Sequence, residues 1–186
     1  MDTAQPDQQW YAVRVKPRYE KVVAFAAHRK GFEEFVPLCI RRHRWSDRSK
    51  PVEVPLFPGY VFCRLKIEQR LSLLTIPGVL HFVGIGRTPA PIDQDEIAAI
   101  QTAVQSGSGI LPWPFLEMGQ RVRLTSGPMA GLEGTLIQAR DQHRFVIGLT
   151  ILRRAIAVEI QNHWVEPVDQ VAGLPSTSFM NGRSSC

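Results

Sequence analysis

Two aromatic rings flank a rigid break in the segment Pro55-Leu56-Phe57-Pro58-Gly59-Tyr60-Val61-Phe62. Proline lacks the amide donor that a sheet ladder requires, and glycine permits a turn or a close backbone approach. Phe57 and Tyr60 are therefore expected at a turn, where large rings suit a protein-binding surface. The alternative is that both rings belong to the core of the strand that follows. The predicted protein-binding residues are Tyr11, Phe57, Pro58 and Tyr60.

Basic residues gather between positions 41 and 50, where Asp47 is the lone counter-charge. One interpretation is a solvated hairpin. The other is a contact with a nucleic-acid backbone, because closely spaced cations release counterions when they meet phosphates. A second basic patch is expected at the start of the first helix. The predicted nucleic-acid-binding residues of the two patches are Lys16, Arg18, Arg29, Arg41, Arg42, Arg44 and Arg48.

Catalytic chemistry is not indicated by any motif. The sequence has no G-x-S-x-G, Walker or G-x-G-x-x-G pattern, and its five histidines are scattered without ligand spacing. Its three cysteines, Cys39, Cys63 and Cys186, form no CxxC pair, which fits a reducing cytoplasm. We therefore expect no enzyme, no catalytic residue, no metal and no cofactor. A remote alternative is an enzyme whose catalytic cluster is assembled only in the fold.

The composition is ordinary for a soluble globular protein, and its basic balance bears on the kind of partner. The net charge is +5 and 44% of residues are hydrophobic, and a mildly basic balance suggests nucleic acid without proving it. The polar N-terminus does not resemble a signal peptide, and no apolar run approaches the roughly 20 residues of a membrane span. We expect a cytoplasmic protein, without membrane contact, that is a monomer.

The elements that must position these residues divide into two domains. Residues 10–105 read as β-α-β-β-β-α-β-α, which predicts an α+β sandwich of helices on a mainly antiparallel sheet. The hairpin tip is expected over Arg41–Pro51. A helix is expected to begin at Asp93 with a capping box, because Glu96 follows three residues later. Ser106-Gly107-Ser108-Gly109 predicts a flexible linker over 106–115.

Five short strands with glycine turns follow the linker and predict a small β-barrel over 116–168. Residues 1–9 and 169–186 are expected to be disordered. Gly134 is expected where neighbouring backbones approach closely. Some apolar residues fall at loop tips, where they serve either the core or a partner interface. The predicted partner-binding residues of this domain are Met129, Leu132, Ile151 and Leu152.

The chain resembles the NusG family of transcription elongation factors. The resemblance rests on Trp10-Tyr11, the Leu-Phe-Pro-Gly-Tyr-Val-Phe block, Pro77-Gly78-Val79, Pro89-Ala90-Pro91-Ile92 and the segment Gly119–Leu136, which looks like a KOW motif. These parts occur in family order. Lys16-Pro17-Arg18-Tyr19-Glu20-Lys21 and Arg44-Trp45-Ser46-Asp47-Arg48 look more like the specialised RfaH- and UpxY-like antiterminators.

The resemblance implies a NusG-type N-terminal domain and a C-terminal KOW domain. It implies that the first domain binds the clamp helices of the largest RNA polymerase subunit, near DNA, and suppresses pausing or termination. The KOW domain would recruit Rho or a small-subunit ribosomal protein. The alternative function is a KOW-containing ribosome- or RNA-binding protein. From the strand pattern we further expect the KOW domain to be β in the free protein, to move independently, and to expose its partner-binding residues.

Overall fold

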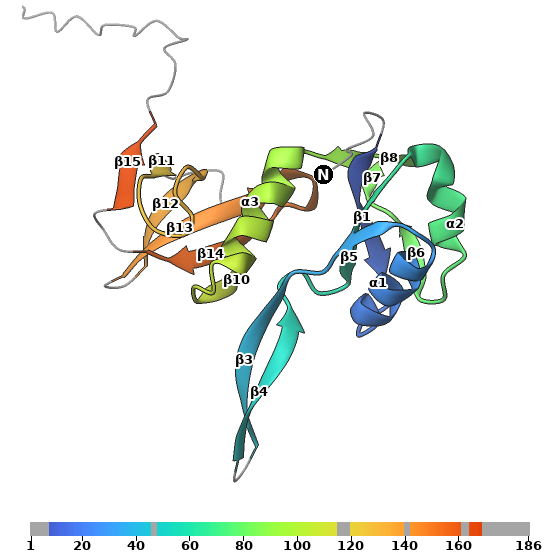
Figure 1. Ribbon diagram of the computed structural model, residues 1–186, viewed down its shortest axis with the longest axis horizontal. Coiled ribbons are helices and arrows are strands. Elements are labelled where there is room, and N and C mark those ends of the chain that lie inside the picture. Colours follow the sequence, from blue (N-terminus) through green and yellow to red (C-terminus); the bar gives the residue numbers. More distant parts are fainter. Residues whose placement is uncertain (1–7, 46–47, 115–119, 140–141, 161–163, 169–186) are drawn as a thin grey trace, which may run out of the picture.

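Helix α3 (Gln94–Gln105) lies between two β-rich halves of the chain, as Figure 1 shows. The structure is a computed structural model, and it describes residues 8–45, 48–114, 120–139, 142–160 and 164–168. We call residues 8–105 the N-terminal domain and the described residues from 110 to 168 the C-terminal β domain. This architecture confirms the predicted fold class, an α+β domain followed by a small β domain.

A five-stranded antiparallel sheet forms the centre of the N-terminal domain, in the order β2-β5-β1-β6, with β9 also paired to β1. Its strands are β1 (Gln9–Val15), β2 (Glu33–Phe35), β5 (Tyr60–Leu65), β6 (Val79–Phe82) and β9 (Pro91–Ile92). Successive side chains of a strand point to opposite faces. Val13 and Val61 accordingly pack among the residues of α1 (Glu20–Arg29) and α2 (Arg70–Leu74), which cover one face. Ala12 and Phe62 pack with α3 on the other face.

The long hairpin of β3 (Leu38–Trp45) and β4 (Arg48–Pro55) projects away from both halves (Figure 1). Its ladder runs from the pair Leu38–Pro55 to the pair Trp45–Arg48. The prediction of a hairpin tip over 41–51 is therefore wrong, since these residues other than 46–47 belong to the strands. Pro51 is accommodated because each strand of a two-stranded ladder has an unpaired edge. A smaller hairpin joins β7 (Gly84–Ile85) to β8 (Thr88–Pro89).

A six-stranded antiparallel sheet makes up the C-terminal β domain, in the order β10-β14-β13-β12-β11-β15. The strands are β10 (Ile110–Pro114), β11 (Gln120–Leu124), β12 (Glu133–Ala139), β13 (Gln142–Leu149), β14 (Arg154–Glu159) and β15 (Val165–Pro167). A short 3-10 helix, η2 (Thr150–Leu152), connects β13 to β14, and another, η1 (Ile67–Gln69), precedes α2. The prediction that this domain is built of strands is confirmed.

Strand β10 corrects the predicted linker. Residues 110–114 pair with β14 along its length, from Ile110–Val158 to Pro114–Arg154. The linker prediction relied on Ser and Gly at 106–109 and extended too far, because β14 offers an edge that an extended segment can join. Of the segments predicted to be disordered, 1–9 and 169–186, residues 1–7 and 169–186 lie outside the described residues. The prediction is wrong for Gln9, which is the first residue of β1 and pairs with Leu65. Within the described ranges, no helix has the length and apolar character needed to cross a membrane.

Candidate functional site

The turn from Phe57 to Tyr60 is held by two charged side chains that come from elsewhere in the sequence. The Gly59 N–H donates to the Glu20 carboxylate at 2.7 Å, and Glu20 is 5% exposed. Arg14 Nη1 donates to the carbonyl oxygens of Pro58 and Gly59 at 3.4 and 3.5 Å. A buried carboxylate is stable only with such partners, because leaving water is costly for a charge. Helix α1 and strand β1 thus fix the shape of this turn together.

Gly59 is required in the turn for two reasons. Its φ angle is +81°, a conformation that side chains rarely adopt. A Cβ at this position would also come within 2.6 Å of Arg14 Nη1. Of the two roles predicted for Gly59, a turn or a close backbone approach, the turn is confirmed; the nearby atoms belong to the Arg14 side chain.

The Tyr60 ring is bordered by arginines of both domains. The guanidinium carbon of Arg14 lies 4.7 Å from the ring centroid, and that of Arg154, in the C-terminal β domain, lies 5.3 Å from it. Both distances fall within the range of a cation–π contact. Tyr60 is half-buried and the preceding Pro58 is exposed. These two residues are the accessible part of the predicted protein-binding surface.

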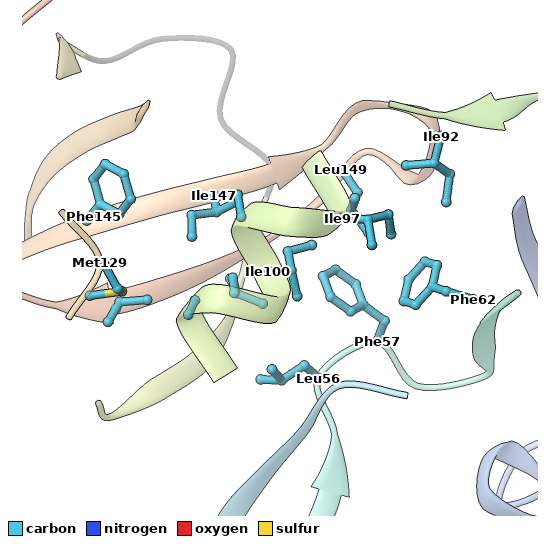
Figure 2. Close-up of a cluster of buried hydrophobic side chains, with 14 of the residues drawn as sticks. Leu56, Phe57, Phe62, Ile92, Ile97, Ile100, Met129, Phe145, Ile147 and Leu149 are labelled. Carbon is cyan, nitrogen blue, oxygen red and sulfur yellow. The ribbon is translucent and has the colours of Figure 1, made fainter. Parts of the chain in front are cut away.

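Phe57 is buried, with 1% of its surface exposed, and its ring meets the edge of Phe62 at a centroid distance of 5.6 Å. Figure 2 shows Phe57 and Phe62 on one side of α3 and Ile147 of the C-terminal β domain on the other. Ile100 of α3 lies between the two phenylalanines on one hand and Ile147 on the other. All four belong to one continuous apolar cluster, which joins the two domains through α3. Of the two expectations for Phe57, a surface residue or a core residue, the structure agrees with the core residue.

Tyr11 does not share the surface of the other three predicted residues. It lies in the cluster on the opposite face of the sheet, where its ring packs edge-on against Phe82 at 6.0 Å. This is a correction to the sequence prediction. Its physical reason is the period of two along β1, which turns Trp10 and Tyr11 to opposite faces.

The four predicted partner-binding residues of the C-terminal β domain lie in or against the interdomain cluster. Met129 is 1% exposed, and Leu132, Ile151 and Leu152 are half-buried against the same cluster. The expectation that all four are exposed in the free protein is wrong for this structure, because Met129 is buried and the other three are partly buried against the cluster that joins the two domains. The expectation that the two domains move independently disagrees with the same packing.

Glu96 joins the two domains through polar contacts. Its carboxylate accepts the backbone N–H of Thr150 at 3.2 Å and also the Thr150 hydroxyl. Thr150 is the first residue of η2, so the carboxylate satisfies an amide that the 3-10 helix leaves unpaired. The capping-box prediction is right for Asp93 and wrong for Glu96. The Asp93 side chain accepts the Asp95 N–H at 2.8 Å, but the Glu96 side chain binds Thr150 of the other domain and does not return to Asp93.

The predicted nucleic-acid-binding residues do not form a single patch. Lys16 and Arg18 are exposed before α1, whereas Arg29 lies in its last turn. Ten helical residues span about 15 Å, so Arg29 lies far from the start of the helix. The expected second patch therefore does not include Arg29. Arg18 and Arg41 line one interdomain cleft. Arg42, Arg44 and Arg48 lie along the β3–β4 ladder, but their side chains are outside the described residues.

The titratable groups of the described residues give no sign of a reaction centre. No three His, Cys, Asp or Glu side chains gather there as metal ligands would. Burial, with a smaller contribution from the charge of Glu34, raises the pKa of Cys63 to about 12. A thiol with this pKa is a poor nucleophile near neutral pH, since the thiolate is the reactive form.

Several residues with a part in the site were missed by sequence reasoning. Glu20 and Arg14 carry no local signal, because their partners lie 39 and 44 or 45 residues away. Thr150 is likewise 54 residues from Glu96. The pair Arg153-Arg154 is different: two adjacent arginines between strands are visible in the sequence as a basic spot and could have been singled out.

Comparison with known proteins shows one consistent family. The model described as "Transcription termination factor nusG" matches residues 8–101. The "Transcription termination/antitermination protein NusG" of Vibrio vulnificus is 29% identical over 178 residues, which cover 88% of this chain and 98% of that protein. The protein of the same name from Thermus thermophilus is 29% identical over 174 residues, covering 82% and 94%.

A solved structure has a similar fold. "Domain interaction in Thermotoga maritima NusG" covers 87% of this chain and 98% of that one, with a TM-score of 0.50 and 21% identity. The names of the relatives support a role in transcription. The resemblance to RfaH- and UpxY-like antiterminators stays a prediction, since the relatives from Vibrio vulnificus and Thermus thermophilus are named NusG.

Proposed function

Since this chain belongs to the NusG family of transcription factors, we propose that it is an elongation factor whose N-terminal domain binds RNA polymerase and suppresses pausing or termination. The target within the polymerase is the clamp helices of its largest subunit, next to the DNA. The mechanism is binding rather than catalysis. A ligand that prefers the closed clamp shifts the polymerase population toward that state.

The observation that carries this proposal is the built turn at Phe57–Tyr60. A buried carboxylate and an arginine fix its backbone, so Pro58 and Tyr60 are displayed without a further entropy cost of ordering. Phe57 is buried and anchors the turn to the apolar cluster, so it is not itself a surface contact. Tyr11 is left out of the proposed contact, since it packs on the other face of the sheet.

The C-terminal β domain is proposed to be a KOW domain that recruits a second partner, Rho or a small-subunit ribosomal protein, through Met129, Leu132, Ile151 and Leu152. These residues pack in the interdomain cluster, so this partner would compete with domain docking. A ligand that binds only the undocked form shifts the population toward it by mass action.

The experiment is a binding measurement between purified RNA polymerase and the full chain. Tyr60→Ala is expected to weaken binding by about 2 kcal/mol, the size typical of a buried aromatic anchor. Tyr19→Ala is the matched control, because Tyr19 is a partly exposed tyrosine (41%) outside the turn. Equal affinities of the two variants would remove the proposed contact. Co-purification with ribosomes in place of polymerase would favour the alternative, a ribosome- or RNA-binding protein.

A further inference from the structure

A cleft of about 1050 Å³ lies between the two domains at the base of the β3–β4 hairpin. The N-terminal domain contributes residues before and in α1 and residues of the hairpin. The C-terminal β domain contributes residues of β10 and of the start of β14. Part of the lining is apolar and includes Val54, Pro55 and Leu56, and the charged side chains come from both domains.

Positive charge is in excess in this cleft. Two carboxylates line it, and both already have partners: Glu53 binds Lys21 Nζ at 2.6 Å, and Glu20 binds the Gly59 amide. Four further cationic side chains line the cleft. Arg154 also borders Tyr60, but a guanidinium has five N–H donors and retains some for a ligand. The four are Arg18, Arg41, Arg153 and Arg154.

Backbone conformation singles out the same cleft. Among the described residues, Arg18 and Arg153 are the two non-glycine residues with positive φ, at 68° and 47°. This left-handed conformation is unfavourable for an arginine, and such outliers gather at ligand-binding sites. These two arginines line the cleft from the two different domains. The two arginines with strained backbones thus lie on opposite sides of the cleft, one from each domain.

The cleft continues into the hairpin, and this continuity suggests the ligand. Arg42, Arg44 and Arg48 follow Arg41 along the ladder, and a strand rises about 3.3 Å per residue. A run of arginine positions in the sequence of a hairpin that leads into a basic cleft suits a polyanion longer than the cleft itself, such as a nucleic-acid backbone with its regularly spaced charges. A nucleic acid carries a charge at every nucleotide, whereas a peptide carries a negative charge only where an acidic side chain occurs.

We propose that this cleft binds the phosphodiester backbone of a nucleic acid, and that Arg153 and Arg154 of the C-terminal β domain complete a site begun by the hairpin. The inference rests on the proposed contact of the hairpin with nucleic acid, and it adds the second domain to that contact. The site is complete only while the domains are docked. Bound nucleic acid therefore stabilises the docked form.

The test uses the full chain and three fluorescein-labelled probes: a 20-nucleotide single-stranded DNA of mixed sequence, its duplex, and polyglutamate. Anisotropy is recorded at several salt concentrations. Arg153→Gln/Arg154→Gln is expected to weaken binding about tenfold at low salt. It is also expected to reduce the slope of log affinity against log salt by about one to two, since each phosphate that is no longer neutralised lowers the slope by about one. The probe whose affinity falls further identifies single strand or duplex as the ligand.

The matched control is Arg121→Gln/Arg123→Gln, which removes the same charge from the same domain. Both arginines bind Glu133 on β12 and neither lines this cleft. The control is expected to change affinity less than twofold. Arg154→Gln alone leaves the left-handed turn at Arg153 untouched and serves if the double variant does not fold. A hairpin variant, Arg42→Gln/Arg44→Gln/Arg48→Gln, completes the set.

Three results would overturn the inference. If the hairpin variant weakens binding and the Arg153/Arg154 variant equals its control, the C-terminal β domain is not part of the site, while the proposed function stands. If neither weakens binding, the hairpin contact fails as well. If the Arg153/Arg154 variant loses affinity for polyglutamate but not for either DNA, the ligand is an acidic protein.

Discussion

The Glu96 carboxylate of α3 receives both the backbone N–H and the hydroxyl of Thr150, 54 residues later in the chain. This contact closes the interface between the domains at the N-terminal end of α3, next to the apolar cluster around Ile97 and Ile100. It couples the proposed polymerase-binding domain to the proposed partner-binding domain. The position of Arg154 beside Tyr60 couples them a second time.

Glu96→Ala is expected to favour undocking of the two domains. The bonds are solvent-exposed, so the expected loss is about 1 kcal/mol and the ratio of undocked to docked molecules rises about fivefold. Alanine is a good helix former, so α3 itself is not weakened. Single-molecule energy transfer between dyes on the two domains measures the ratio. Asp95→Ala, the adjacent carboxylate, is the control, and an equal response of both variants would show that the Thr150 contact does not hold the domains.

Phe57→Ala is expected to destabilise the fold by about 3 to 5 kcal/mol, because it leaves a cavity beside Phe62 in the interdomain cluster. Phe25→Ala is the matched control: Phe25 lies on α1 and is 66% exposed, so its loss should stay within about 0.5 kcal/mol. Chemical denaturation of both variants gives the two values. A small loss for Phe57→Ala would mean that Phe57 is accessible in solution and free to serve as a direct polymerase contact.

Gly134→Ala is expected to destabilise the C-terminal β domain by about 1 to 3 kcal/mol. An added Cβ would lie 2.7 Å from the Val146 carbonyl oxygen and 2.7 Å from the Phe145 ring, and the first of these is backbone that cannot move aside easily. Gly109→Ala is the control, because nothing lies within 4 Å of the added atom. Thermal unfolding compares the two variants, and a neutral Gly134→Ala would contradict the close packing of β12 on β13.

Lowering the pH is expected to weaken the contact between strands β11 and β12 by protonating the Glu133 carboxylate, which binds Arg121 and Arg123. Its hydrogen bond with Arg123, helped by Arg121, lowers the pKa of the Glu133 carboxyl below its usual value. Because the folded-state pKa is depressed, the stabilisation is present above the unfolded-state pKa, about 4.3, and is lost as the pH falls through the folded-state pKa. Urea midpoints at pH 6 and pH 3 should differ less for Glu133→Gln than for the unaltered chain. An unchanged difference would show that the carboxylate contributes nothing.

Local patterns predicted the elements of this fold and missed what joins them. The apolar run at Tyr60–Leu65 predicted a buried strand, and β5 is buried on both faces because α1, α2 and α3 cover the sheet. Gly59 and Gly134 were recognised, since a turn and a close approach favour glycine locally. The contacts of Glu20, Glu96 and Arg154 depend on partners in distant segments. Met129 is buried in the apolar cluster that joins the two domains, which no local pattern reports.

The central claim, that this protein acts on transcribing polymerase, is tested most directly by in vitro transcription with purified RNA polymerase on a template with known pause and Rho-dependent termination sites. We expect the protein to shorten pauses or raise read-through, and Tyr60→Ala to lose most of this effect while Tyr19→Ala retains it. Elongation that is identical with and without the protein, at concentrations that saturate polymerase binding, would contradict the account.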